Sequence, residues 1–174
     1  PLPVLPAAVS CHFRDPYEYA PMNQLGPWIQ DALDLIEWAN GPATSTWGVK
    51  RAAAGHPEPF NLEYLAIGNE EWGQEYKDRF TQFYNAVRSA YPDIKIIGTS
   101  GPYAGGSDFD DLWNFNRQLG VDLVDEHYYM SPEWFQNNTH RYDSYSRTGP
   151  KVFAGEYACW GNAVYNAISE AAYM

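Results

Sequence analysis

The sequence predicts an α/β fold, and more narrowly part of a (β/α)8 barrel in which five βα units are visible. Polar residues follow short apolar runs at Glu70, Ser100, Tyr129 and Glu156, with spacings of 30, 29 and 27 residues. A strand–helix–strand rhythm of about 30 residues is typical of a parallel sheet. An open doubly wound sheet is an alternative. The polar residues at the strand ends favour the barrel, as does the lack of a Gly-rich phosphate loop after the first run.

The first half of the chain alternates apolar runs with one clear helical pattern. Residues 4–9 predict a short buried strand, although prolines at positions 1, 3 and 6 cannot donate to a sheet ladder. Residues 24–40 have a helical period that Gly41-Pro42 ends, and a long Gly/Pro-rich connection follows over residues 41–60. Residues 64–69 predict the next strand, and a helix follows from about Glu75 to Ala90.

The second half repeats the same alternation. Residues 94–98 predict a strand, and Asp108 is expected to cap a helix that Gly120 closes. Residues 121–129 predict another strand, followed by a weaker helix over residues 132–145. The last strand is expected at residues 151–158 and the last helix at 163–172.

Composition limits the classes of partner. The 174 residues suffice for one domain with a real core, and 45% of them are apolar. The net charge is -11, and the sequence contains no Lys/Arg cluster. Neither nucleic acid nor an anionic membrane surface is therefore expected as a partner. The aromatic share of 17% gives slight support to sugar binding, because aromatic faces pack on the C–H faces of sugars.

Metal and cofactor signals are lacking in the sequence. Cys11 and Cys159 have neither the spacing of metal ligands nor that of a disulfide framework, and the four histidines are scattered. We therefore expect no metal and no cofactor. The first residues lack the features of a signal peptide, and no run is long enough to span a membrane. A secreted or periplasmic location is nevertheless expected in preference to a cytoplasmic one.

Glu70 and Glu156 are the leading catalytic candidates. Each follows a short apolar run and a glycine, Gly68 or Gly155. Glycoside hydrolysis commonly uses one carboxyl group to protonate the leaving oxygen and one carboxylate to attack or to direct water. Either glutamate could instead simply begin a solvated loop. Their occurrence at two similar strand ends suggests paired carboxylates facing one pocket.

Other polar and aromatic residues lie near the same predicted strand ends. Strand alternation puts Asp125, His127 and Tyr129 on one face, where His127 and Tyr129 could hold a carboxylate in its working orientation. A His–Asp pair that bridges to a neighbouring helix is the alternative. Asn69 could bond a substrate hydroxyl or simply form an Asx turn. Tryptophans expected in loops, which could stack on a sugar ring or pack in the core, are Trp47, Trp72 and Trp160.

Several motifs together resemble one family. These are Ser45-Thr46-Trp47-Gly48, Gly55-His56-Pro57-Glu58-Pro59-Phe60, Ala66-Ile67-Gly68-Asn69-Glu70, His127-Tyr128-Tyr129 and Phe153-Ala154-Gly155-Glu156-Tyr157-Ala158. In this order they resemble the α-L-arabinofuranosidases of glycoside hydrolase family 51. Gly-Asn-Glu is shared by a wider clan of barrel glycosidases, whereas the Gly-His-Pro-Glu-Pro-Phe loop is much more specific.

The resemblance implies a retaining glycoside hydrolase that releases terminal α-L-arabinofuranosyl residues from plant polysaccharides or oligosaccharides. It implies that Glu70 is the acid/base and Glu156 the nucleophile, with Asn69 on the sugar 2-hydroxyl and Tyr129 near the nucleophile. His127 would match the family's His-x-Tyr motif. It also suggests oligomers for the full-length enzyme, and Cys11 and Cys159 would lie on well-separated strands without forming a disulfide.

The resemblance also implies that residues 1–174 are a single catalytic-barrel segment, truncated at both ends. The segment would run from barrel strand three to the helix after strand seven, with no β-sandwich domain. Two alternatives to the leading function stay open. One is a β-glycanase of the same clan, and the other is an inactive truncated barrel that only binds sugar.

Overall fold

A computed structural model describes residues 2–10, 18–161 and 163–173 of the chain. They form a five-stranded parallel sheet with the strand order β1-β2-β3-β4-β5. The strands are β1 (Val4–Leu5), β2 (Tyr64–Ile67), β3 (Lys95–Thr99), β4 (Leu123–Met130) and β5 (Lys151–Cys159). The helices are α1 (Gly26–Asn40), α2 (Thr46–Ala53), α3 (Gly73–Ala90), α4 (Ser107–Leu119), α5 (Pro132–Asn137) and α6 (Ala163–Tyr173), with 3₁₀ turns η1 (Met22–Gln24) and η2 (Arg141–Ser144).

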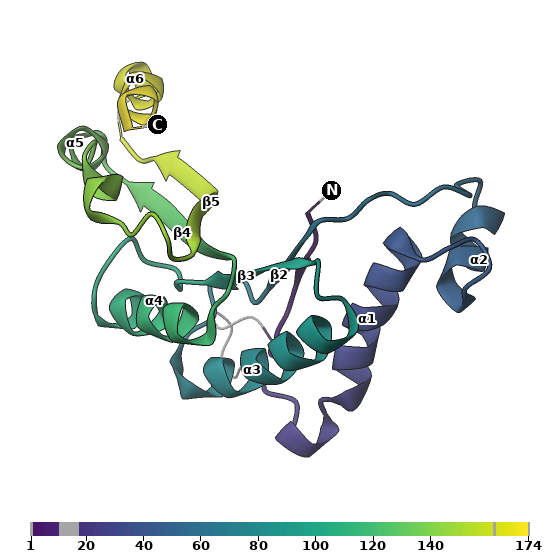
Figure 1. Cartoon of the computed structure of the whole chain (residues 1–174). Helices are drawn as coiled ribbons and strands as arrows, with labels where there is room; N and C mark the ends of the chain where they lie inside the picture. The colour runs from purple at the N-terminus through teal and green to yellow at the C-terminus, as the bar shows by residue number, and fades with distance from the viewer. Residues whose placement is uncertain (1, 11–17, 162, 174) are drawn as a thin grey trace.

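The strand order confirms part of a barrel over the doubly wound alternative. Every strand pairs with its neighbour in sequence, and a helix follows each strand. The strands fan through an arc with the helices on its outer side (Figure 1). A doubly wound sheet reverses its strand order and carries helices on both faces. The five predicted βα units are therefore confirmed as an arc of parallel sheet.

The core lies between the sheet and the helices α1, α3 and α4. On α3, Tyr76, Phe80, Phe83 and Val87 recur at helical spacing and are all buried. They pack with strand residues such as Ile96 in one hydrophobic cluster. The apolar stripe of α3 faces the sheet and contacts both β2 and β3. This packing fixes the end of β2 relative to β3.

Three expected elements differ from the structure. The predicted strand 4–9 is only two residues long, since Pro6 offers no N–H and Ala8 takes a positive φ of 60° before Val9 pairs antiparallel with Tyr19. The predicted helix 132–145 ends at Asn137, and η2 follows as a separate turn. Asp108 lies inside the first turn of α4 and does not cap it, because the N-cap is Gly106.

The connection 41–60 contains helix α2, which its Gly/Pro-rich composition did not predict. Ser45 caps α2 by accepting a hydrogen bond from the Gly48 N–H, and Arg51 is completely buried. The guanidinium of Arg51 donates to the carbonyls of Trp38, His56 and Pro57. These bonds, to residues 5, 6 and 13 positions away along the chain, fix a segment whose Gly/Pro-rich composition predicts a loop.

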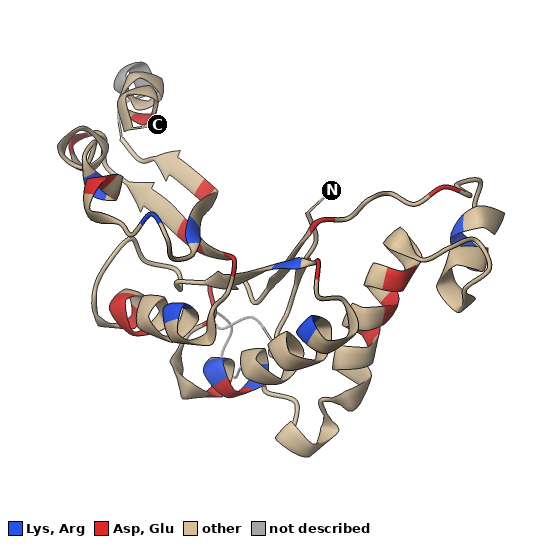
Figure 2. Ribbon diagram, viewed as in Figure 1, with Lys and Arg blue, Asp and Glu red and all other residues tan. Residues whose placement is uncertain are grey.

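Charged residues lie mainly on the outer helices. Figure 2 shows acidic residues along α1 and at the start of α4, with basic residues singly or in pairs over the molecule. Within the described residues, no helix is both long enough and apolar enough to cross a membrane. Cys159 is a buried free thiol, and Cys11 lies outside the described residues, so the expectation for this cysteine pair stays a prediction.

Candidate active site

Glu70 follows β2 in an unusual backbone conformation. Its φ is +53°, in the left-handed region that non-glycine residues seldom adopt. Gly68, two residues earlier, has a φ of +84°, and a Cβ there would lie 2.5 Å from the Tyr76 ring. The Tyr76 hydroxyl donates to the Ile67 carbonyl and accepts from the Thr99 N–H. The chain therefore turns tightly over a buried tyrosine to deliver Glu70.

Glu156 lies on β5 just after a bulge. The register shifts between Asp125 and His127, so that Asp125 pairs with Phe153 while His127 pairs with Glu156. Gly155 N–H donates to Asp125 Oδ1 at 2.9 Å, and a Cβ on Gly155 would lie 2.3 Å from that oxygen. Bulges re-aim side chains next to functional sites. Here the bulge brings Glu156 level with His127.

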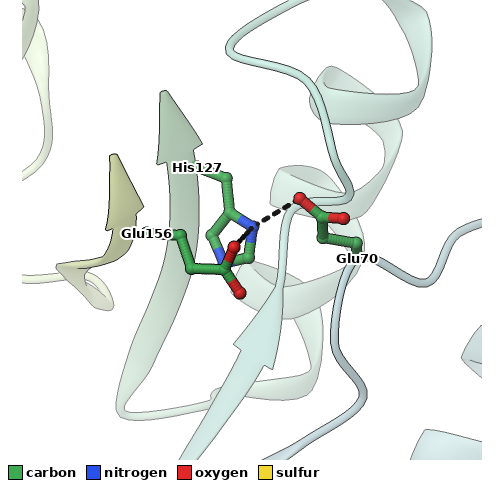
Figure 3. Close-up of side chains that lie close together, drawn as sticks. All are labelled: Glu70, His127 and Glu156. Carbon is green, nitrogen blue, oxygen red and sulfur yellow. Dashed lines mark hydrogen bonds and ion pairs between the residues drawn. The ribbon is translucent and has the colours of Figure 1, made fainter. Parts of the chain in front are cut away.

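His127 lies between the two glutamates (Figure 3). Its Nδ1 is 2.9 Å from Glu70 Oε1 and 3.8 Å from Glu156 Oε2, and its Nε2 is 3.1 Å from Asp125 Oδ2. Burial lowers the pKa of His127, but hydrogen bonds to Asp125 and Glu70 and the charges of Asp125 and Glu156 outweigh burial and raise the pKa to about 9. At neutral pH both ring nitrogens therefore carry protons and donate to carboxylates.

The structure brings Glu70 and Glu156 together as the sequence predicts. One carboxylate oxygen of each and Nδ1 or Nε2 of His127 all lie within 4.8 Å of one another. Tyr129 lies beside them, and its hydroxyl donates to Glu156 Oε2 at 2.8 Å. This hydrogen bond, followed by burial and the charge of Glu156, raises the pKa of Tyr129. The hydrogen bond holds Glu156 by its Oε2 atom, while the Glu156 side chain is 38% exposed.

Glu70, His127 and Glu156 are also the one group of potential metal ligands within the described parts of the chain. A metal would need a free lone pair on the histidine nitrogen that bound it. Because the pKa of His127 is about 9, a metal ion would have to displace a proton from this histidine in order to bind here.

A cavity of about 750 Å³ opens beside the two glutamates. The Tyr129 ring packs 5.5 Å from that of Trp160, which is 65% exposed, and Tyr103 is 57% exposed. Exposed aromatic faces next to carboxylates suit a sugar ligand. The lining residues are Glu70, Pro102, Tyr103, Ala104, Gly105, Tyr129, Met130, Trp134, Glu156 and Trp160.

His127, which is buried, does not line the cavity, and three other predicted site residues also lie outside this lining. Asn69 is exposed and adjoins Glu70. Trp72 precedes α3 and packs partly against the core, so it is not free in a loop. Trp47 was expected in a loop but lies in α2, where Lys50 Nζ is 3.5 Å above its ring. Figure 1 places α2 at the opposite end of the molecule from α5 and α6. Contact of these three residues with sugar stays a prediction.

Sequence reasoning missed several residues of the site. Tyr103 and Trp134 line the cavity, and each lies a few residues after a strand end, which is the signal that could have found them. Glu71, next to Glu70 in the sequence, is only 5% exposed, and its Oε1 accepts the Ala7 N–H at 3.1 Å. Burial raises the pKa of Glu71 to about 7, against hydrogen bonds from Ala7 and Asn69 and the charge of Arg79.

Comparisons with known proteins agree with this geometry. The sequence profile of the alpha-L-arabinofuranosidase 1 domain matches residues 3–147. The chain is 54% identical over 176 residues to an extracellular exo-alpha-L-arabinofuranosidase of Streptomyces chartreusis, covering 100% of this chain and 21% of the relative. It is 42% identical over 133 residues to alpha-L-arabinofuranosidase 2 of Arabidopsis thaliana, covering 76% of this chain and 18% of the relative.

A solved structure extends the likeness to three dimensions. An arabinose-bound family 51 α-L-arabinofuranosidase matches with a TM-score of 0.76 and 30% identity, over 98% of this chain and 28% of that one. The chain thus spans about a fifth to a quarter of the length of its relatives. From the domain match, the sequence identity and the shared fold together, the chain belongs to the α-L-arabinofuranosidases of glycoside hydrolase family 51.

Proposed function

We propose that these residues form the catalytic centre of a retaining hydrolase that releases terminal α-L-arabinofuranosyl residues from arabinose-containing oligo- or polysaccharides. The observation that carries the proposal is the closeness of Glu70 and Glu156, whose carboxylate oxygens lie within 4.8 Å of each other. Retaining glycosidases hold their two carboxyl groups about 5–5.5 Å apart, whereas inverting enzymes need about 6.5–9.5 Å for an intervening water. One oxygen of each carboxylate lies within 4.8 Å of the other, a short contact that suits a retaining pair and supports direct attack by one carboxylate on the sugar.

In the first step Glu70 gives a proton to the glycosidic oxygen while a Glu156 oxygen attacks the anomeric carbon. The bond to the leaving group breaks as the ester to Glu156 forms. Tyr129 supports this assignment because its hydroxyl holds Glu156 Oε2 and leaves Oε1 as the attacking atom. His127 Nδ1 donates to Glu70 Oε1, so Glu70 Oε2 is the oxygen that carries the proton given to the glycosidic oxygen.

In the second step Glu70, now ionised, takes a proton from water. The resulting hydroxide attacks the same carbon from the side that the leaving group occupied, and the ester to Glu156 breaks. Two inversions give net retention of configuration. Asp125, which bonds both His127 and the bulge at Gly155, keeps the histidine and Glu156 in register through both steps.

Relatives narrow the substrate class. The two relatives described above and the solved structure are α-L-arabinofuranosidases, which does not favour the β-glycanase alternative. The Streptomyces relative is named extracellular, which supports a secreted location for the full-length protein. Oligomer formation by the full-length enzyme stays a prediction.

Turnover of 4-nitrophenyl α-L-arabinofuranoside by the full-length protein tests the proposal. Glu156→Ala should reduce kcat by about 10⁴-fold or more, because no covalent intermediate can form. A matched control is Glu63→Ala, since Glu63 is exposed just before β2, at the opposite end of that strand from Glu70. Equal activity of the Glu156 and Glu63 variants would refute the assigned nucleophile. Absence of turnover by the wild type would refute the proposed function.

A further inference from the structure

A buried ion pair lies behind one wall of the cavity. Glu126 is completely buried on the face of β4 opposite to His127, although a lone charge there would be costly. Arg141 Nε donates to Glu126 Oε2 at 3.1 Å, and its side chain is 13% exposed. The charge of Glu126 outweighs burial and raises the pKa of Arg141, so the guanidinium stays ionised. None of these contacts is used in the chemistry at Glu70 and Glu156.

Glu126 is fixed by further donors and so provides a rigid anchor for Arg141. Trp113 Nε1 donates at 2.7 Å and the Tyr145 hydroxyl at 2.9 Å to Glu126 Oε1. The Tyr128 hydroxyl donates to the other oxygen. With donors from α4, β4 and the segment after η2, Glu126 has no freedom to follow a moving arginine.

The Nη2 end of the Arg141 guanidinium binds the segment 102–105, which forms one wall of the cavity. Arg141 Nη2 donates to the Ala104 carbonyl at 2.7 Å, and Ala104 belongs to the segment 102–105 that lines the cavity. The guanidinium also lies 5.7 Å from the ring centroid of Trp134, a second lining residue. Arg141 therefore joins the segment after β3 to the segment after β4, and it does so from outside the cavity.

The position of this wall indicates which part of a substrate it meets. The segment 102–105 follows β3, which pairs with β2, and β2 delivers Glu70. Glu70 is the group that protonates the leaving oxygen, so sugar units beyond that oxygen extend along its side of the cavity. Tyr103, the one aromatic residue of this segment, is exposed and lines this side of the cavity.

We propose that Arg141 is a positioning residue for leaving-group specificity: anchored on Glu126, it holds the segment 102–105 in place to bind the part of the substrate beyond the arabinosyl unit. This inference rests on the proposed function. It predicts a role in binding longer substrates and little role in the bond-breaking step.

The test compares Arg141→Gln and Arg141→Lys in the full-length protein with an arabino-oligosaccharide and 4-nitrophenyl α-L-arabinofuranoside. Arg141→Gln should raise KM for the oligosaccharide about tenfold, while kcat for the nitrophenyl substrate stays within about twofold of wild type. Amide hydrogen exchange in residues 102–105 should become faster. Arg141→Lys should recover only part of the loss, since an ammonium lacks the planar fork that contacts both partners. The matched control is Arg147→Gln, which removes the same charge from an exposed site in a nearby segment.

Three outcomes decide between the possibilities. If KM for the oligosaccharide and exchange in 102–105 match the Arg147→Gln control, the inference is overturned while the proposed function stands. A wild type that turns over neither substrate overturns both. If Arg141→Gln does not fold because Glu126 is left unpaired, the double variant Glu126→Gln/Arg141→Gln removes that charge and still lacks the bond to Ala104. It should then show the same selective rise in KM, and a normal KM would overturn the inference.

Discussion

At the scale of single residues, the site depends on a glutamate held in a conformation that costs free energy. A non-glycine residue at the φ of +53° seen for Glu70 costs on the order of 1 kcal/mol. The hydrogen bond to His127 and the tight turn at Gly68 hold Glu70 there. Strained residues of this kind persist where surrounding contacts hold them in place, and they are concentrated at functional sites.

The role assigned to Glu70 predicts a dependence on the leaving group. Glu70→Ala should reduce kcat/KM for an arabino-oligosaccharide by about 10²–10⁴-fold, because its alkoxide leaving group needs a proton. For a dinitrophenyl arabinofuranoside, whose leaving group needs no proton, formation of the glycosyl-enzyme should be far less affected. Pre-steady-state kinetics on both substrates check this, and equal losses on both would contradict an acid role.

Glu71, beside the acid/base, predicts a pH-dependent stability. Its pKa rises from an ordinary 4.5 to about 7 in the folded protein, so the folded state binds the proton more tightly than the unfolded chain. Its contribution to the free energy of unfolding is full below pH 4.5 and is lost as pH rises through 7, by up to about 3 kcal/mol. Glu71→Gln, which mimics the neutral acid, should leave Tm almost unchanged at pH 4.5 and raise it relative to wild type at pH 8. Equal Tm differences at both values of pH would argue against a buried, titrating Glu71.

At the scale of elements, the bulge between β4 and β5 sets the aim of the nucleophile. Gly155→Ala would place a Cβ 2.3 Å from Asp125 Oδ1, so either the bulge or Asp125 must move. We expect kcat to fall by at least about tenfold, since misplacement by about 1 Å is costly in catalysis. Gly26→Ala is the control, because a Cβ at the start of α1 meets nothing within 4 Å. Comparable kcat values for the two variants would contradict this role of the bulge.

The elements that sequence predicts well are those with strong local patterns. Strands β2 to β5 and helices α1, α3 and α4 follow their apolar periodicity to within a few residues. Gly120 closes α4 in the left-handed conformation, as its position after Leu119 predicts. The paired glutamates were found by the same reasoning, because parallel strands present their C-terminal ends at one edge of the sheet.

The features that sequence could not predict depend on distant contacts. Helix α2 has a local N-cap in Ser45, but burial of Arg51 also depends on the Trp38 carbonyl, 13 residues away along the chain, and that bond cannot be read from the sequence. The burial of Glu71 requires the Ala7 N–H, 64 residues away along the chain. Tyr103 and Trp134 follow strand ends, where cavity residues are expected, but sequence alone does not distinguish them from aromatic residues that only pack in the core.

At the scale of the whole molecule, the described strands form an arc of parallel sheet with two edges. In the described residues β1 pairs only with β2, and β5 pairs only with β4. Unpaired edges of a sheet recruit other strands. A polypeptide of residues 1–174 should therefore self-associate through these edges, which light scattering would detect. A monodisperse, cooperatively melting monomer of residues 1–174 would contradict this expectation.

If Glu156 attacks the sugar, the arabinose that is released first keeps the anomeric configuration of the substrate. The configuration of the first product is therefore the measurement to make. Proton NMR can follow the anomeric signals of arabinofuranose as the full-length protein begins to hydrolyse an α-L-arabinofuranoside, before mutarotation mixes the two anomers. Carboxylate oxygens within 4.8 Å of each other predict that the α-anomer appears first. Initial release of the β-anomer would mean that water attacks the substrate in a single step, and it would contradict the role assigned to Glu156.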